Sequence, residues 1–407
     1  MRSGRDGTAT PEIAAAPAPR ANPELLGHEA AESALRRLVA TGRLPHALIL
    51  SGPRGIGKAT LAFRMARFVL ANGVGEGALG GLFGDTEGEG LGIAPDSGTF
   101  RRVASGGHAD LLTVERAWDP RRRRLRGEIV VDNTREIGAF LRLTPAEGGW
   151  RVVIVDGADE MNRNAANALL KILEEPPLRA LLLLVAHSPG RLLPTIRSRC
   201  RRFPLAPLPP AIVHRLLVRY RPDLREGQAA ALTALSGGSI GRALDLAAAG
   251  GVELYDAVLA LISPERGIDP VALHAFADRL ARGDAEEAYR AVEELVAQLL
   301  ARIAGAAARG NAPAEPRPDP DPPPHLEGRV GAEPRRLPDP PPQVGEGQVG
   351  EPRESAVLRR LGERAPAARW AELRDEIARN FARTDALNLD KKQTILGAFF
   401  AIEGVAR

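Results

Sequence analysis

Cysteine is almost absent from this sequence, and its absence limits what the chain can be. Among 407 residues the single cysteine, Cys200, cannot form an internal disulfide or an all-cysteine zinc site, so a reducing cytoplasm is the expected compartment. Long apolar runs are also lacking: the longest covers residues 180–186, and residues 1–22 hold no apolar core resembling a signal peptide. We therefore expect a cytoplasmic protein with no membrane segment.

The overall composition is that of a globular protein. Hydrophobic residues make up 44% of the chain and charged residues 26%, and the length allows two or three domains with their own cores. The formal net charge of +4, carried by an arginine-rich set of cations, indicates only weakly a partner that bears phosphates.

The pattern of apolar residues predicts an α/β region followed by an all-α region. Short apolar runs suit the strands of a parallel sheet buried on both faces, and they occupy residues 47–50, 128–131, 151–155 and 181–185. Beyond residue 210 only helical patterns follow, over residues 211–220, 270–281, 284–303 and 355–383.

Three stretches lack such patterns and are expected to stay outside the folded domains. Residues 1–22 read as a disordered tail rich in alanine and proline. Residues 71–107 form a glycine-dense insertion, and residues 305–353 contain repeated proline-rich segments that favour extended conformations.

A phosphate-binding loop is predicted between the first apolar run and the helix after it. Gly52, Gly55, Gly57 and Lys58 have the G-x-x-x-x-G-K spacing, in which backbone N–H groups surround phosphate oxygens and the lysine reaches the terminal phosphates. A chance match in a chain with 43 glycines is the alternative, and the flanking strand and helix favour the loop.

The residue after the lysine departs from the motif. The hydroxyl that should bind magnesium is replaced by Ala59, and Thr60 comes one place late, about 100° further round the helix. Binding of ATP with magnesium is therefore possible but doubtful.

The second nucleotide motif is incomplete as well. Asp156 ends an apolar strand, as a magnesium-binding aspartate should, but Gly157 stands where active ATPases carry a glutamate that activates water. Asp159 and Glu160 are better interpreted as capping and surface carboxylates. The two motifs together predict at most nucleotide binding, with little or no hydrolysis.

Three blocks further along carry a family resemblance: NRNAANALLKILEEPP (residues 162–177), LLLLVAHSP (181–189) and LLPTIRSRC (192–200). Together they closely resemble the AAA+ clamp-loader subunits of bacterial DNA polymerase III. The resemblance implies an AAA+ P-loop domain over residues 23–207, a small helical lid over residues 208–250, and a helical collar that oligomerises over residues 251–407.

The same resemblance assigns roles to individual residues. Arg199 would be an arginine finger offered in trans to the γ-phosphate of ATP held by a neighbouring subunit, with Ser198 and Cys200 beside it at the interface. Ser188 and Arg242 would correspond to the two sensor positions of the nucleotide site. The alternatives are a solvated basic stretch around Arg199, and ordinary capping and surface charge at the sensor positions.

The losses also suggest which kind of subunit the chain resembles. Active loader subunits keep the hydroxyl, the Asp-Glu pair and usually a four-cysteine zinc module, so no zinc is expected here. A decayed site with a retained Ser-Arg-Cys finger looks like the delta-prime family, whereas a delta subunit would not be expected to keep the finger. This implies a component of the DNA-directed DNA polymerase (nucleotidyltransferase) holoenzyme without autonomous catalysis.

The implied partners are the gamma/tau and delta subunits in a hetero-pentamer, the sliding clamp, and primed DNA through the complex. Two other readings stay open. One is a self-sufficient AAA+ ATPase that remodels DNA or protein, in which Thr60 and Asp159 take over the lost roles. The other is a non-replicative AAA+ adaptor.

Overall fold

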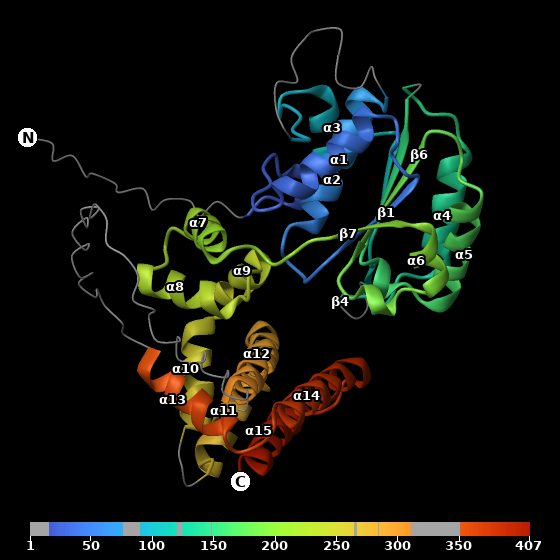
Figure 1. Cartoon of the computed structure of the whole chain (residues 1–407). Helices are drawn as coiled ribbons and strands as arrows, with labels where there is room; N and C mark the ends of the chain where they lie inside the picture. The colour runs from blue at the N-terminus through green and yellow to red at the C-terminus, as the bar shows by residue number, and fades with distance from the viewer. Residues whose placement is uncertain are drawn as a thin grey trace, which may run out of the picture. The chain divides into compact units, whose positions relative to one another are not determined.

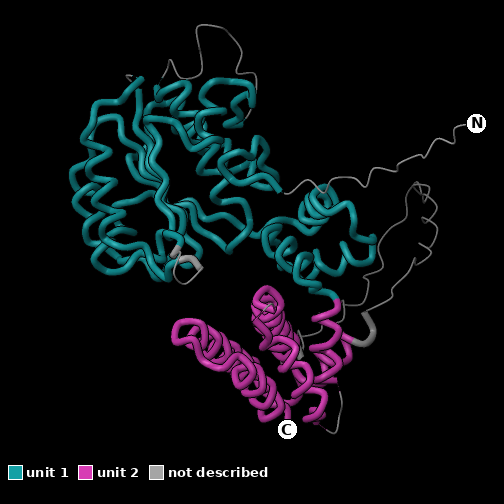
Figure 2. The backbone as a smooth tube through the Cα atoms, turned by 180° about the vertical axis from the view of Figure 1, so that it is seen from behind, with its two compact units in different colours: residues 1–252 teal, residues 253–407 magenta. Residues whose placement is uncertain are grey.

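The computed structural model describes residues 16–75, 90–119, 124–147, 149–263, 267–283, 285–310 and 351–407. The chain divides into two compact units, residues 1–252 and residues 253–407, and helix α10 (Gly251–Ile262) spans the division (Figure 2).

The first unit is built on a parallel sheet. Its strand order is β2-β5-β6-β1-β7, and every neighbouring pair in it is parallel, so β1 lies between β6 and β7 (Figure 1). The strands are β1 (Ala47–Ser51), β2 (Leu111–Val114), β5 (Arg151–Asp156), β6 (Ala180–Ala186) and β7 (Arg201–Pro204). A separate antiparallel pair joins β3 (Trp118–Asp119) to β4 (Arg124–Leu125).

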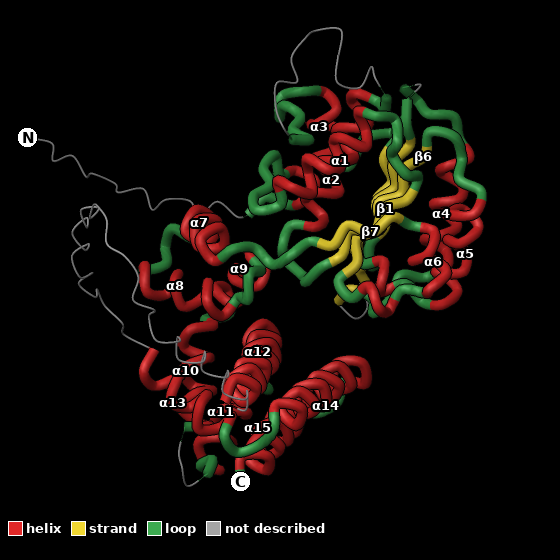
Figure 3. Tube along the Cα trace, viewed as in Figure 1, coloured by secondary structure: helices red, strands yellow, loops and turns green. Residues whose placement is uncertain are grey.

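Helices cover both faces of the sheet, and each face has its own core. In β1, Leu48 and Leu50 belong to the core that includes α1, α2 and α3, whereas Ala47 and Ile49 belong to the core that includes α4, α5 and α6 (Figure 3). Burial on both sides explains why these strands are continuous apolar runs. The helices are α1 (Glu29–Ala40), α2 (Lys58–Asn72), α3 (Gly98–Ser105), α4 (Val131–Arg142), α5 (Arg163–Glu174) and α6 (Pro194–Arg199).

The remaining elements are helical, as predicted. In the first unit they are α7 (Pro210–Tyr220), α8 (Glu226–Leu235) and α9 (Ile240–Ala248), and in the second they are α11 (Pro270–Leu280), α12 (Glu286–Gly310), α13 (Glu351–Gly362), α14 (Ala367–Leu387) and α15 (Lys391–Ala406). The single helix predicted over residues 355–383 is two, because Pro366 precedes α14 in an extended conformation. None of the helices in the described ranges is long and apolar enough to cross a bilayer.

One predicted strand is wrong. Residues 128–131 do not join the sheet: Ile129 makes an isolated bridge to Met161, and α4 begins at Val131. Asn133 causes the difference, because its side-chain oxygen accepts a hydrogen bond from the Val130 N–H (3.2 Å) and caps the helix start.

Neither of the two edge strands of the sheet was predicted from the sequence. β2 is only four residues long, and β7 contains two arginines, which are exposed because an edge strand has a neighbour on one side only. β2 is thus too short, and β7 too polar, to be recognised by periodicity.

Parts of the three stretches expected to stay outside the domains are folded. α3 lies within the predicted glycine-rich insertion, where Ser97 caps it by accepting a hydrogen bond from Phe100 N (3.1 Å). In the predicted tail, residues 16–22 are described and include a short 3-10 helix, η1 (Pro19–Ala21). α12 and α13 extend into the predicted proline-rich segment from either side, while residues 1–15, 76–89 and 311–350 lie outside the described residues.

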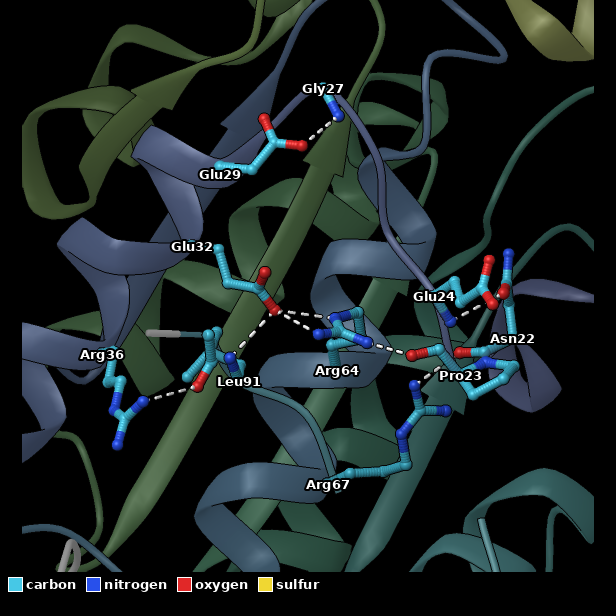
Figure 4. Close-up of polar contacts among 11 residues, drawn as sticks. Asn22, Pro23, Glu24, Gly27, Glu29, Glu32, Arg36, Arg64, Arg67 and Leu91 are labelled. Carbon is cyan, nitrogen blue, oxygen red and sulfur yellow. Dashed lines mark hydrogen bonds and ion pairs between the residues drawn. The ribbon is translucent and has the colours of Figure 1, made fainter. Parts of the chain in front are cut away.

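A buried ion pair joins α1 to α2 beside the sheet. Arg64 donates to Glu32 (2.6 and 2.7 Å), and the same carboxylate accepts from Leu91 N at 2.9 Å (Figure 4). Arg64 also donates to the backbone oxygen of Pro23. Four segments that are distant in the sequence therefore meet at one carboxylate and one guanidinium.

Arg67, one helical turn after Arg64, fixes the segment before α1. Its guanidinium donates to the backbone oxygens of Arg20 and Asn22, both at 2.7 Å, and lies 4.5 Å from the ring centre of Phe100. Arg67 is only 1% exposed, and burial lowers its pKa to about 10. It remains charged at neutral pH, and the carbonyl oxygens compensate for its lost hydration.

The Glu32–Arg64 pair gives a first testable prediction. Glu32→Gln leaves the buried Arg64 without its counter-charge, so we expect the free energy of unfolding to fall by about 3 kcal/mol, measured by urea denaturation. The control is Asp132→Asn, which removes an ion pair to Arg135 whose side chains are 80% and 74% exposed and should change stability by less than about 0.5 kcal/mol. Equal losses in the two variants would contradict the assignment.

Candidate functional site

The P-loop occupies the turn between the end of β1 and the start of α2. Gly52, Gly55 and Gly57 lie in this turn, and Lys58 is the first residue of α2. The loop therefore meets the amino-terminal end of a long helix, where free N–H groups and the helix dipole favour anions.

Two other segments pack against the loop. From the segment before α1, a ring nitrogen of His28 lies 2.7 Å from the Ile56 backbone oxygen. From the lid, Gly241 N donates to Gly55 O at 3.0 Å, and a Cβ on Gly55 would lie 2.4 Å from Ser239 Oγ. Position 55 therefore requires glycine, because the lid approaches the P-loop too closely for a side chain there. These contacts are tertiary, and the sequence motif did not predict them.

The predicted sensor arginine comes to the same place. Arg242 is in the first turn of α9, next to the glycine that bonds to the P-loop, and its backbone N–H donates to the Ser239 hydroxyl at 3.1 Å. The structure therefore places Arg242 beside the loop, and its sensor role stays a prediction.

Lys58 and Asp156 face the loop from α2 and β5. Lys58 is 3% exposed, and its ammonium group donates to Pro53 O at 2.5 Å. Burial lowers the pKa of Lys58 to about 8, against the opposing effect of Asp156. Burial, together with Glu115, raises the pKa of Asp156. The two motif residues thus lie in one poorly hydrated site, as their spacing predicts.

The position after Lys58 offers no hydroxyl. Ala59 occupies it, and Thr60, the next residue along α2, is buried with 8% exposure. At the head of α2 the described residues 57–60 place no hydroxyl directly after Lys58, so they do not complete the usual magnesium site.

Asp159 is not the surface carboxylate that the sequence suggested. It is 7% exposed and accepts hydrogen bonds from His187 N (2.9 Å) and Ser188 N (2.8 Å), which joins the 3-10 helix η3 (Ala158–Glu160) to the end of β6. Burial alone would raise the pKa of Asp159, but the amide hydrogen bonds outweigh it and lower the pKa. Asp159 positions the predicted sensor Ser188 and is committed to backbone amides.

The role of Asp159 can be tested through pH. Its pKa in the folded chain lies below the ordinary value of 3.8, so its stabilisation is present above about pH 4 and is lost as pH falls through the folded pKa. Asp159→Asn should lower the free energy of unfolding by about 1–3 kcal/mol at pH 7, with a smaller difference at pH 3. Urea denaturation at both pH values measures this, and a difference independent of pH would argue against the carboxylate.

Gly157, at the position of the missing catalytic glutamate, has a backbone conformation suited to glycine. Its φ is +82°, and a Cβ built on it would lie 2.7 Å from Glu160 Oε2. Glu160 is itself no solvated surface residue: its side chain is 12% exposed, and it forms ion pairs with Arg54 of the P-loop and with Arg116 (2.8 Å). The predicted surface role of Glu160 is therefore wrong.

This geometry predicts that the glutamate cannot simply be restored. Gly157→Glu should lower the free energy of unfolding by about 1–2 kcal/mol and yield no ATP turnover by the isolated chain, even combined with Ala59→Thr. Gly157→Ala is the control for backbone strain and should account for most of the stability loss. Magnesium-dependent turnover by the double variant, with unchanged stability, is the contrary result.

The predicted arginine finger lies at the end of α6. The Arg199 guanidinium pairs with Glu174 (2.9 Å) and donates to Thr195 O (3.1 Å), and the side chain is 38% exposed. Ser198 donates to the same Thr195 oxygen at 3.0 Å. Both side chains therefore lie at the surface, and each is held by a hydrogen bond to the backbone oxygen of Thr195.

Cys200, the third residue of the triplet, points the other way. It is 8% exposed, belongs to the core that includes α4, α5 and α6, and burial raises its pKa to about 12. In this chain Cys200 is a packing residue and does not lie at the surface, where the sequence predicted an interface. Of the three residues, only Ser198 and Arg199 are exposed.

Sheet register separates Arg199 from the chain's own P-loop. Arg201, two residues after Arg199, pairs with Leu48 near the start of β1, whereas the P-loop follows Ser51 at the end of β1. Because β1 and β7 are parallel, Arg199 lies at the amino-terminal edge of the sheet and the P-loop at the carboxyl-terminal edge.

These features define a class of protein. A five-stranded parallel sheet ordered β2-β5-β6-β1-β7, a P-loop after β1, an aspartate ending β5 and a helical lid on the loop are the architecture of an AAA+ P-loop protein. Within this class, residues 27–209 match the family described as DNA polymerase III, delta subunit.

Curated relatives of the chain include two kinds of DNA polymerase III subunit. The chain is 40% identical over 197 residues to DNA polymerase III subunit delta' of Pseudomonas aeruginosa, covering 48% of this chain and 53% of that protein. It is 34% identical over 214 residues to subunit delta' of Escherichia coli (52% and 58%), and 32% identical over 196 residues to subunit gamma/tau of Mycobacterium bovis (48% and 30%). About half of the chain, including residues 27–209, is therefore similar to delta' and gamma/tau subunits of DNA polymerase III. The match spans about half the length of the delta' relatives.

Proposed function

We propose that the chain acts as the delta-prime subunit of a DNA polymerase III clamp loader. Its task would be to assist the ATP-driven loading of a sliding clamp onto primed DNA during replication. The support is the match to delta' proteins, with higher identity to the Pseudomonas aeruginosa delta' protein than to gamma/tau. By the same reasoning its partners are gamma/tau and delta subunits in a hetero-pentamer, the clamp, and DNA held by the complex.

The observation that carries the mechanism is the placement of Arg199. Arg199 is partly exposed at the sheet edge opposite the chain's own P-loop, and this placement supports a role at the nucleotide site of a neighbour and not at its own. A guanidinium donated to the γ-phosphate of a neighbouring ATP neutralises charge in the transition state. Hydrolysis in the neighbour then depends on correct docking of this chain.

The chain's own site contributes no hydrolysis in this proposal. Ala59 offers no magnesium ligand, Gly157 offers no carboxylate for the attacking water, and Asp159 is bound to two backbone amides. The residues present therefore do not fit a working site for ATP and magnesium, and the subunit is a component of the polymerase assembly without catalysis of its own.

ATP turnover of a loader reconstituted with the full chain, with saturating clamp and primed DNA, tests this proposal. An arginine finger is worth about 10³-fold or more at the site it serves, so Arg199→Ala should abolish the contribution of that one site. Lys58→Ala should leave turnover within about twofold of wild type, because the chain's own loop does not hydrolyse ATP.

The matched control is Arg202→Ala, which removes an exposed arginine three positions away. It should leave turnover near wild type, which separates a specific finger from a general basic surface. If Lys58→Ala is the damaging change and the isolated chain hydrolyses ATP, the chain is a self-sufficient motor and the role in trans is wrong.

A further inference from the structure

An arginine of the P-loop reaches across to the second nucleotide motif. Arg54 projects from the loop and forms an ion pair with Glu160 in η3, the element that follows β5. The pair therefore joins the two motifs that, in an active ATPase, are joined through the nucleotide and its magnesium ion.

The charges around this pair identify its position. Arg54 and Lys58 both act electrostatically on the Asp156 carboxylate, and so do Glu115 and Glu160. Arg54 also acts on His187, which follows β6 at the same edge of the sheet. The partly exposed guanidinium of Arg54 is thus near the ends of β5 and β6, beside the P-loop, which is where terminal phosphates and magnesium are bound in this class.

Glu160 crowds the position at which a side chain on residue 157 would start. One of its oxygens lies 2.7 Å from the position of a Cβ on Gly157, so the carboxylate stands where the side chain of a residue at 157 would begin. Arg116 holds it from the other side at 2.8 Å, with a side chain that is 27% exposed. The carboxylate is fixed between two arginines.

We propose that Arg54 is an internal latch: its guanidinium takes the place of the magnesium ion as the cation beside the acidic residues, and its pairing with Glu160 closes the P-loop against nucleotide. The cation that balances the acidic residues of the site is the guanidinium of the chain itself. A nucleotide must displace Arg54 from Glu160 before its phosphates enter the loop, and this displacement opposes binding. The contact between Arg54 and Glu160 thereby adds to the effect of Ala59 and Gly157, which replace the magnesium-binding hydroxyl and the catalytic glutamate.

The latch predicts an effect of Arg54 on nucleotide affinity that is opposite to the effect expected of an ordinary P-loop arginine. If Arg54 is a phosphate ligand, removing it weakens nucleotide binding; if it is a latch, removing it strengthens binding. Arg116 remains to hold Glu160 in the variant, so the change isolates the bridge to the loop. The test uses the isolated full-length chain and is therefore independent of the role proposed for Arg199.

The experiment is titration calorimetry of ADP and of ATP, each with and without magnesium, into wild type and Arg54→Gln. The latch predicts binding about fivefold tighter in Arg54→Gln, a size typical of one released ion pair, and the gain should be present without magnesium. The Arg54 side chain is 62% exposed, so the variant should keep the thermal unfolding midpoint of wild type.

Arg135→Gln is the matched control, because it removes an exposed, paired arginine on α4 and should leave affinity unchanged. Arg54→Lys provides a second variant: it keeps a cation near Glu160 and should stay within about twofold of wild type. Weaker nucleotide binding by Arg54→Gln than by wild type would overturn the latch. Equal affinity of the two proteins would overturn it as well, and so would a failure to detect nucleotide binding by either protein.

Discussion

Parallel pairing of β1 with both β6 and β7 is the constraint on which the rest of the first unit depends. It places the end of β1 beside the end of β6, which brings the P-loop, Asp156 and Ser188 to one edge. It also places the start of β7 beside the start of β1, which puts Arg199 at the other edge. With five residues in β1, the two edges are separated by about 16 Å of extended chain. The sheet therefore provides two chemically distinct ends.

The nucleotide site differs from that of an active ATPase both in its residues and in the contacts that its acidic side chains make. Two residues that chemistry requires are replaced, and the acids that remain are engaged by the chain itself: Asp159 by backbone amides and Glu160 by arginines. A buried charge without a partner is costly, and the chain itself supplies the partners of both carboxylates. The lid remains bonded to the P-loop through Gly241 and Gly55.

Sequence reasoning recovered what depends on local pattern and failed where tertiary contacts decide. Continuous apolar runs identified β1, β5 and β6, and the glycine spacing located the loop. The run at residues 128–131 misled because a capping residue, Asn133, outweighs three apolar positions. The burial of Asp159 and Glu160 follows from neighbours at residues 187, 188, 54 and 116, which no motif connects. For the same reason no pattern indicated that Cys200 is a core residue.

Arg64 and Arg67 hold the segment before α1 entirely through main-chain oxygens, those of residues 20, 22 and 23. Every amino acid supplies such an oxygen, whereas only arginine supplies several donors in a planar fork. The two partners therefore face unequal evolutionary constraints: side chains in the segment are free to drift as long as its backbone path persists, while each arginine is nearly irreplaceable. A region of low sequence similarity can in this way remain structurally invariant beside the most recognisable helix of the protein.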